Sequence, residues 1–546
     1  MKYILLFVCQ LTVSFAAVCQ VPQWSDFKLL AGQSHDEGNA ITVDKHDNTY
    51  LAVSSQNPLS SLFHEPLPDE VCNVIQPVRG NSYNGAVFRF DSSRNLTLSV
   101  VIEGATLGQI GVDGAGNIYV SGLMQYGAQR DAFVKKYSST GDLIWSKLVE
   151  SASSGRNADD FITSLDVSSD GSLVLCGLGY GDQVALLGQY HPGPLSFVAK
   201  LNPDGEVAWT QSFGSDLGYG AFRVKFDGAS DVLMAGNEKV AGTNELRATF
   251  AKLEAMTGDV LWKKQFHSNG QYVPRGTAIS TTSNLYVFGG TFGGELTIDG
   301  ITVRARGALD VFLLQCDLDG NINWVKTAGS SGRETLYDLA EDNGKIYLTG
   351  GFADGFQLNS TSYASKGNTD VYIGALDNDG NTLWVLTGGS ADQKDDIIRD
   401  EKGSKMAINS KGHLQVIGTT IGRGNFGSLN YVASEETLTN AFWLTLGDKA
   451  STYTVYYPCD GTTVLDFSLT VYPNPFEQSL TISNSQGLNL DYNLVLTNSV
   501  GQKLDERYFP DSSTITVDAW NALAAGVYFL KIDAGDYSKV FKLIKK

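Results

Sequence analysis

Charged side chains recur in polar or glycine-rich segments of the chain, where carboxylates and guanidinium groups could bind or act on a polar ligand. Paired carboxylates can act as acid and base in glycoside hydrolysis, and arginine suits carboxylate or phosphate groups. Tyr219 and Tyr272 accompany these charges, and such a mixture suits a glycan or a peptide. The candidate ligand-binding residues are Asp36, Arg156, Asp160, Arg275, Arg333, Glu334, Asp395 and Asp396.

Two aspartate-rich turns contain enough oxygen donors to suit calcium. They are Asp317-Leu-Asp319-Gly-Asn321 and the similar run from Asp377 to Asn381. An EF-hand loop needs further donors and a glutamate at its twelfth position, whereas strand residues intervene here, so we expect these aspartates to cap their own turns. The histidines are scattered, so no zinc site is predicted. We predict no cofactor, and calcium is the one ion that these turns would suit.

No complete motif for nucleophilic catalysis is present. Gly32-Gln-Ser34 continues with His35-Asp36, whereas a serine nucleophile of the Gly-x-Ser-x-Gly type needs a second glycine two residues after the serine. The formal net charge is −19, which opposes a nucleic-acid or anionic-membrane partner. The sequence therefore favours binding over catalysis, without settling the question of catalysis.

A strand–turn–strand motif that ends on tryptophan recurs along the chain. The elements that it forms must position the candidate ligand-binding residues. In the copy from Asp310 to Trp324, alternating apolar residues lead into Asp319-Gly320-Asn321, and a second run ends on the tryptophan. Glycine and asparagine accept the positive φ of a tight hairpin, so each copy predicts two antiparallel strands. We expect the tryptophans to pack between neighbouring repeats. The copies span residues 131–145, 196–209, 248–262, 310–324 and 370–384.

A further strand ending in glycine precedes each motif, as in Asn117–Gly122. Residues 21–447 divide into seven such units of about 60 residues, the size of a four-stranded propeller blade. The last unit lacks a fourth strand, and Phe27–Gly32 matches Trp324–Gly329 in spacing. We expect this N-terminal segment to complete the last sheet, because closure removes an open strand edge. The candidate ligand-binding residues would then lie in loops around one mouth of the central channel.

Residues 27–447 resemble a bacterial β-propeller repeat family with the pattern GNxYVxG…DxFVxKLxxxGxxxW. Asn117–Gly122 followed by Asp131–Trp145 shows this pattern almost intact. Members of the family are mostly extracellular, so the resemblance implies a shape and little chemistry.

Seven short alternating runs occupy residues 468–546 and predict a small immunoglobulin-like β-sandwich. A linker at 448–467 precedes it, and we expect one extended piece within this linker. The predicted fold is thus all-β, a seven-bladed β-propeller followed by this sandwich. Val471–Phe476, Leu494–Gly501, Gly526–Lys531 and a lysine-rich final strand resemble the type A C-terminal sorting domain of type IX secretion. The resemblance assigns the sorting motif to Pro473, Asn474, Pro475, Gly501, Gly526, Val527 and Tyr528.

The sorting-domain resemblance implies recognition by the type IX outer-membrane export machinery. It also implies a location outside the cell or on the outer-membrane surface of a Gram-negative bacterium. Residues 1–20 agree, since Lys2 precedes an apolar run that ends in small residues, which predicts a secretory signal peptide. No later stretch reaches the ~18 apolar residues of a transmembrane helix.

These features predict a secreted or surface-displayed binding or adhesion protein with a glycan or protein ligand. Two alternatives stay open. The first is an extracellular hydrolase or lyase that acts on polysaccharide at the channel mouth. The second is a structural subunit of a surface assembly.

Overall fold

The computed structural model describes most of the chain, and all structural statements below refer to the described part. The predicted signal peptide lies outside it. The described residues are 23–30, 35–56, 83–126, 129–152, 160–213, 221–228, 231–240, 243, 245–270, 275–282, 284–358, 361–390, 401–426, 429–432, 439–447, 452–456, 469–476, 479–484, 490–498, 502–512, 514–518, 520, 523–534 and 537–546. None of them forms a helix long and apolar enough to span a bilayer.

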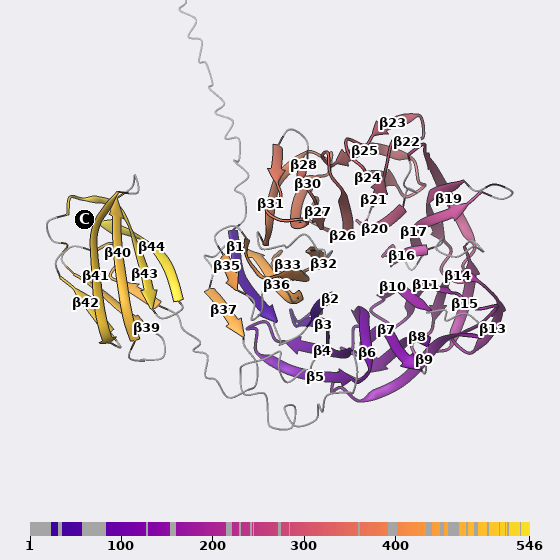
Figure 1. Cartoon of the computed structure of the whole chain (residues 1–546). Helices are drawn as coiled ribbons and strands as arrows, with labels where there is room; N and C mark the ends of the chain where they lie inside the picture. Colours follow the sequence, from indigo (N-terminus) through magenta and orange to yellow (C-terminus); the bar gives the residue numbers. More distant parts are fainter. Residues whose placement is uncertain are drawn as a thin grey trace, which may run out of the picture.

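Strands β1 to β37 form seven sheets arranged around a ring (Figure 1). The predicted all-β propeller class is confirmed. The four main strands of each sheet are, sheet by sheet, β2 (Asp36–Val43), β3 (Thr49–Ser55), β4 (Asn84–Phe90) and β5 (Leu96–Ile102); β6 (Ala105–Val112), β7 (Ile118–Tyr126), β8 (Gln129–Tyr137) and β9 (Leu143–Ala152); β10 (Phe161–Val167), β11 (Leu173–Gly179), β14 (Leu195–Leu201) and β15 (Val207–Ser212); β16 (Ala221–Phe226), β17 (Val232–Lys239), β18 (Leu246–Leu253) and β19 (Val260–Ser268); β20 (Arg275–Thr281), β21 (Leu285–Phe292), β24 (Asp310–Asp317) and β25 (Ile322–Ala328); β26 (Glu334–Asp342), β27 (Lys345–Phe352), β30 (Asp370–Asp377) and β31 (Thr382–Ser390); and β32 (Lys402–Ile408), β33 (Leu414–Ile421), β36 (Thr439–Gly447) and β1 (Gln23–Leu30).

The N-terminal strand closes the ring. β1 pairs antiparallel with β36, which sets Phe27 opposite Leu444 and Leu30 opposite Ala441, as the sequence predicts. The expected extended piece after residue 447 is β37 (Thr452–Tyr456), which pairs with the other edge of β1 in parallel. The N-terminal strand is therefore held on both sides by segments from the C-terminal end of the propeller.

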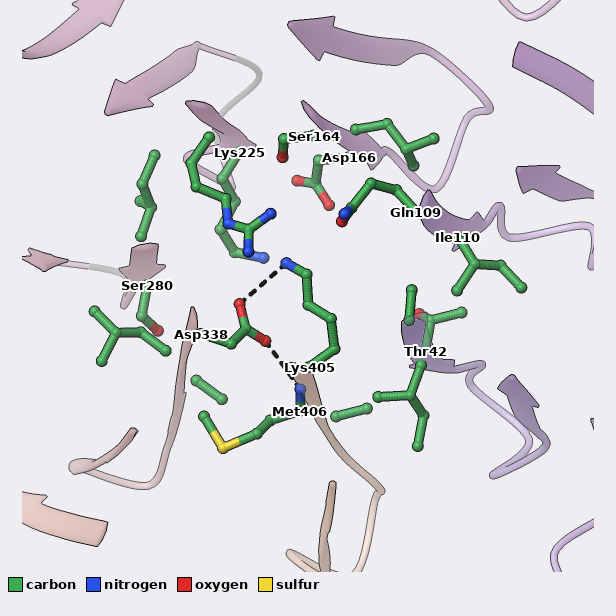
Figure 2. A pocket seen from close by; sticks show the side chains of 18 of the residues that line it. Thr42, Gln109, Ile110, Ser164, Asp166, Lys225, Ser280, Asp338, Lys405 and Met406 are labelled. Carbon is green, nitrogen blue, oxygen red and sulfur yellow. Dashed lines mark hydrogen bonds and ion pairs between the residues drawn. The ribbon is translucent and has the colours of Figure 1, made fainter. Parts of the chain in front are cut away.

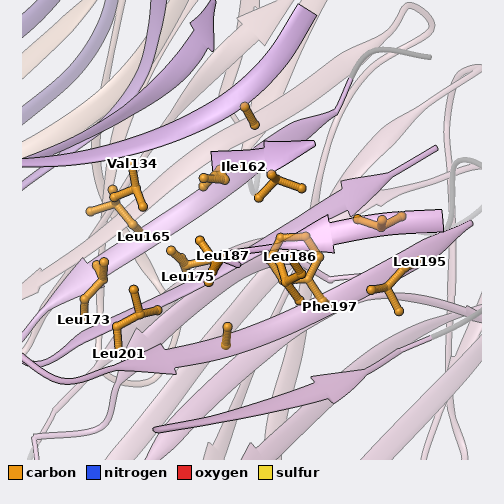
Figure 3. Close-up of a cluster of buried hydrophobic side chains, with 14 of the residues drawn as sticks. Val134, Ile162, Leu165, Leu173, Leu175, Leu186, Leu187, Leu195, Phe197 and Leu201 are labelled. Atoms are coloured by element: carbon orange, nitrogen blue, oxygen red, sulfur yellow. The ribbon is translucent and has the colours of Figure 1, made fainter. Parts of the chain in front are cut away.

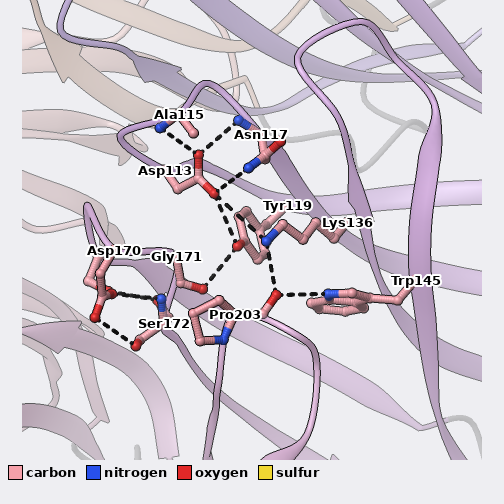
Figure 4. Close-up of polar contacts among 11 residues, drawn as sticks. Asp113, Ala115, Asn117, Tyr119, Lys136, Trp145, Asp170, Gly171, Ser172 and Pro203 are labelled. Carbon is pink, nitrogen blue, oxygen red and sulfur yellow. Dashed lines mark hydrogen bonds and ion pairs between the residues drawn. The ribbon is translucent and has the colours of Figure 1, made fainter.

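The repeated tryptophans pack between neighbouring sheets, as predicted. The Trp145 indole Nε1 donates a hydrogen bond to the carbonyl of Pro203, 3.2 Å away in the hairpin of the next sheet (Figure 4). A Cβ on Gly205 of that hairpin, where φ is +87°, would lie 3.0 Å from the Trp145 ring. Glycine is thus required there both for its backbone conformation and for the close approach. The same donation runs from Trp209 to Ala255, from Trp262 to Leu318 and from Trp324 to Asn378.

Short hairpins between the second and third strands join four pairs of neighbouring sheets, a feature that the sequence did not predict. Each hairpin pairs its first strand with the outermost strand of the preceding sheet. In two of them both turn residues have positive φ, Leu187-Gly188 and Asp299-Gly300, as a two-residue type I′ turn requires. The hairpins are β12 (Gln183–Leu186) with β13 (Gln189–Pro192), β22 (Glu295–Ile298) with β23 (Ile301–Arg304), β28 (Gly355–Leu358) with β29 (Thr361–Ala364), and β34 (Arg423–Phe426) with β35 (Leu429–Val432).

The apolar core of the propeller lies between adjacent sheets. One cluster combines Val134 of β8 with Leu175 and Phe197 of the next sheet, and Leu186 of the β12–β13 hairpin fills the same space (Figure 3). All four side chains are at most 1% exposed. The hairpins therefore add strands to the sheets and also add side chains to the apolar core between them.

The C-terminal residues form two sheets around one core. β38 (Leu469–Tyr472), β39 (Leu480–Asn484) and β42 (Thr514–Val517) make the first sheet, and β41 (Lys503–Ser512), β40 (Leu490–Asn498), β43 (Gly526–Ala534) and β44 (Tyr537–Lys545) make the second. Ile482 and Ile515 of the first sheet share a buried cluster with Leu494, Leu530 and Leu543 of the second. The seven predicted runs are thus all strands, and the immunoglobulin-like relationship stays a prediction.

Deletion of β1 tests the closure. A mature chain without residues 23–30 loses the pairing with both β36 and β37, so we expect its Tm in calorimetry to fall by at least ~5 °C, because a loss of 1 kcal/mol shifts Tm of a large domain by ~2–4 °C. A chain that ends after Gly447 keeps the β1–β36 pairing and should lose less. An unchanged Tm in the chain without β1 contradicts the closure.

Candidate functional site

A cavity of about 340 Å³ lies in the central channel and is lined by all seven inner strands (Figure 2). Each inner strand has a register shift at the same place, so that one residue in each bulges out of the regular pairing with the second strand. Bulges re-aim backbone and side-chain groups. The bulged residues are Asn39, Gly108, Thr163, Phe222, Thr277, Tyr337 and Ser404.

Arg223 of β16 binds the carbonyls of three bulged residues from three other inner strands. Its Nε donates to Thr277 at 2.9 Å, its Nη2 to Tyr337 at 2.7 Å and its Nη1 to Thr163 at 3.4 Å. A guanidinium carries five N–H donors in a rigid fork, so it can bridge several carbonyls at once. Arg223 therefore joins the inner strands of four blades across the channel.

An ion pair stands beside Arg223. The Lys405 ammonium lies 3.1 Å from Asp338 Oδ1, and Asp338 Oδ2 accepts the Met406 N–H at 2.9 Å (Figure 2). Burial lowers the pKa of Lys405 to about 8, and the positive charges of Arg223 and Lys225 act in the same direction, against the effect of Asp338. Lys405 is thus largely removed from water, with two further cations near it.

None of the described sequence-predicted residues lines this cavity. Three of them lie at the ends of the inner strands that are farther from the cavity, each three residues before the bulge. These residues, Asp36, Asp160 and Glu334, are fully buried at 0% exposure. We expect these three residues in loops around the channel mouth, whereas the structure buries each side chain in the packed interior. Glu401 occupies the equivalent buried position before β32, and nothing in the sequence except its acidic type pointed to it.

Of the other five predicted residues, two lie within the described part of the chain. Arg333 is exposed, and the backbone of Arg275 begins β20. Arg156, Asp395 and Asp396 lie outside the described residues. The described candidates come from the starts of different inner strands and from one exposed position, and ligand binding by the eight candidates stays a prediction.

Sequence reasoning missed the channel residues Arg223, Lys225, Asp338 and Lys405. Arg223 and Lys225 flank Val224 in an otherwise short apolar strand, and charged residues at alternate positions of an inner strand are the signal that could have found them.

The buried carboxyl groups have raised pKa values. Burial raises the pKa of Glu334 to about 8, and the nearby charges of Asp310 and Asp354 add to the shift, while a hydrogen bond from the Ser330 hydroxyl at 2.9 Å opposes it. Burial also raises the pKa of Asp160 and of Asp370 to about 6 and that of Glu401 to about 7. Each value lies above that of an ordinary carboxyl group, so neutral pH leaves part of this set protonated.

The aspartate-rich turns are structural, as predicted. Asp317 Oδ1 accepts the N–H groups of Asp319 and Asn321 at 3.0 and 2.8 Å, and Asp377 makes the same bonds in its own turn. Among the described residues no group of three or more His, Cys, Asp or Glu side chains is arranged to hold a metal ion.

The predicted sorting motif fastens the last strand of the chain. The Asn474 side chain donates to the carbonyl of Lys542 at 2.8 Å and accepts the Ile544 N–H at 2.9 Å, as a neighbouring strand would. Phe476 continues this edge, since its N–H donates to Ile544 and its carbonyl accepts from Lys546. Both Pro473 and Pro475 follow cis peptide bonds.

The remaining motif residues lie around β43. Gly526 begins the strand, Val527 is 38% exposed, and the Tyr528 hydroxyl donates to the carbonyl of Ala524 at 2.8 Å. Gly501 lies outside the described residues.

Comparisons with known proteins found similar solved structures and one matching family model. The propeller resembles solved propeller structures: the Dos1 propeller (10% identity, 80% of this chain and 97% of that chain, TM-score 0.38) and the β-propeller domain of the Trilobed protease from Pyrococcus furiosus (9%, 79% and 99%, 0.40). The polysaccharide lyase Uly1 is also similar (9%, 75% and 90%, 0.36). Likeness at this level carries no argument about activity. No curated protein matches the chain in sequence.

The C-terminal match is more specific. Residues 470–546 match the family model of the secretion system C-terminal sorting domain. The protein is therefore a secreted or cell-surface protein of a Gram-negative bacterium, exported through that domain, as the motifs predict.

The buried carboxyl groups predict a stability that falls as pH rises. The folded pKa of Glu334 lies above its usual value of 4.5, so its contribution is complete below about pH 4.5 and is lost as pH passes through about 8. We expect the Tm of the wild type to fall between pH 5 and 8.5. Glu334→Gln cannot ionise and should flatten this fall, with a gain on the order of 2–4 kcal/mol at pH 8.5. The control is Glu206→Gln, at a carboxylate that is 72% exposed. Parallel profiles for Glu334→Gln and the wild type would refute the assignment.

Removal of the Asn474 side chain should loosen β44. Two hydrogen bonds of ~0.5–1.5 kcal/mol each are lost in Asn474→Ala, so amide exchange in residues 537–546, measured by mass spectrometry, should accelerate about tenfold. Exchange in β40 serves as the internal control, and equal rates in β44 of both proteins would contradict the clamp.

Proposed function

We propose that the protein is a binding or adhesion protein, displayed on the cell surface or secreted, whose ligand enters the central channel of the propeller. The observation that carries this proposal is the cavity of about 340 Å³ with polar side chains from several blades converging on it. Ligand pockets occupy this range of volumes and contain a few convergent polar groups.

The state of the channel carboxylates favours binding over hydrolysis. Asp166 Oδ2 accepts the N–H of Phe226 at 2.8 Å, and Asp338 is held by Met406 and Lys405. A general acid and base would need carboxyl groups that can exchange protons with a substrate. Carboxylates tied to the backbone instead keep the inner strands in place, and the hydrolase or lyase stays the alternative, as does the structural subunit.

The proposal includes a division of the chain by role. Residues 1–20 direct the chain across the inner membrane, residues 21–447 bind the ligand, 448–467 link the domains, and 468–546 are read by the type IX export machinery. Because β37 pairs with β1, a fragment for binding studies should extend to Tyr456.

A binding screen tests this function. The mature full chain is applied to an array of glycans and surface proteins, and release of reducing ends or peptides is followed in parallel. We expect saturable binding to at least one ligand without turnover. Turnover of any polymer favours the hydrolase or lyase, whereas self-association without a ligand favours the structural subunit.

A further inference from the structure

We propose that the channel cavity is a site for a sugar acid, a hydroxylated carboxylate of about monosaccharide size that is free or terminal on a glycan. Arg223 and Lys225 would hold the carboxylate. This inference rests on the proposed function and names the chemical class of its ligand.

Two of the three cations that line the cavity make no ion pair with the described residues, although three carboxylates line the cavity as well. Arg223 bonds only to backbone carbonyls among the described residues, which carry partial charges. Lys225 makes neither a hydrogen bond nor an ion pair with the described residues, although it lines the cavity and its side chain is directed there (Figure 2). Two of the three channel cations thus have no anionic partner, in a protein whose overall charge is −19.

Each carboxylate of the cavity accepts at least one hydrogen bond from the protein. Asp338 pairs with Lys405, and Asp166 accepts a backbone N–H. Glu341, at the end of β26, accepts the Gly344 N–H at 2.8 Å in its own turn. An incoming carboxylate would therefore meet free donors on Arg223 and Lys225, and charge-assisted hydrogen bonds of this kind are among the strongest that proteins make.

The rest of the lining suits hydroxyl groups. Thr42, Gln109 and Ser280 come from three other inner strands and line the same cavity with hydroxyl and amide groups (Figure 2). Such groups both donate and accept, as sugar hydroxyls do. A volume of about 340 Å³ lies at the small end of ligand pockets, which favours one sugar unit over a longer segment.

The protonation state of Lys405 should change when an anionic ligand binds in the cavity. Burial and the charges of Arg223 and Lys225 hold the pKa of Lys405 at about 8, with Asp338 opposing the shift. A bound anion would favour the charged ammonium and raise this pKa further. Binding near pH 8.5 should therefore take up protons, whereas binding at pH 6.5, where Lys405 is already charged, should not.

Calorimetric titration of the mature full chain tests the inference. The probes are D-galacturonate, galactose 6-sulfate and neutral galactose, and buffers of different ionisation enthalpy report proton uptake. We expect galacturonate to bind at least about tenfold more tightly than galactose, with proton uptake only at the higher pH. Tighter binding of the sulfate than of galacturonate would overturn the choice of a carboxylate.

Two variants complete the test. Lys225→Gln should weaken galacturonate binding at least about tenfold, and its Tm should stay unchanged, since Lys225 has no partner among the described residues to lose. Lys531→Gln makes the same charge change in the sorting domain, where Lys531 is 50% exposed, and should bind as the wild type does. Equal affinities in Lys225→Gln and the wild type, or equal affinities for galacturonate and galactose, refute the inference. Binding of a neutral ligand from the array would then leave the proposed function intact, whereas no ligand at all removes both.

Discussion

Ring closure by β1 is the interaction on which the rest of the structure depends. Each sheet of a propeller buries its faces against two neighbours, so the seven inner strands surround a channel only when the last sheet is complete. β1 supplies the missing strand and is itself held between β36 and β37. The common position of the bulges then brings the carbonyls of Thr163, Thr277 and Tyr337 within reach of one side chain, Arg223. The pairing of β1 that closes the ring and the hydrogen bonds of Arg223 across the channel thus depend on the same circular arrangement of sheets.

The sequence predicts those contacts that recur in every blade. The tryptophan of one unit and the hairpin glycine of the next meet again and again, as Trp145 meets Gly205, and where Leu98 replaces the tryptophan it packs beside Gly141 in the same way. Such a contact can be predicted from the sequence because the same two residue types recur at the same spacing in each repeat. The joining hairpins escaped notice because their strands are four residues long, too short for an alternation such as Glu295-Leu-Thr-Ile298 to stand out from the loop around it.

The candidate site could not be predicted for a different reason. The segments around Asp36, Asp160 and Glu334 are polar, and a polar segment usually faces solvent. Burial depends instead on position three residues before the bulge, where a side chain meets the interior of the neighbouring blade. The channel charges are single departures from the repeat: Ala40, Gln109, Ser164 and Ala278 occupy the places that correspond to Arg223, Asp338 and Lys405. A search for repeated patterns finds residues that all blades share, whereas the charged residues of this cavity each occur in one blade only.

The buried acids and the channel lysine Lys405 change protonation over the same pH range. Glu401 and Lys405 stand four residues apart at the start of one inner strand, a separation of ~13 Å along an extended chain. Interactions across the interior are screened less than those through water. When Glu401 and Glu334 are protonated, the inner strands carry less negative charge at that end. As pH rises through 7 to 8, these carboxyl groups ionise and Lys405 begins to lose its proton. Over this range the ionisation of the acids and the loss of the Lys405 proton both make the inner strands less positive.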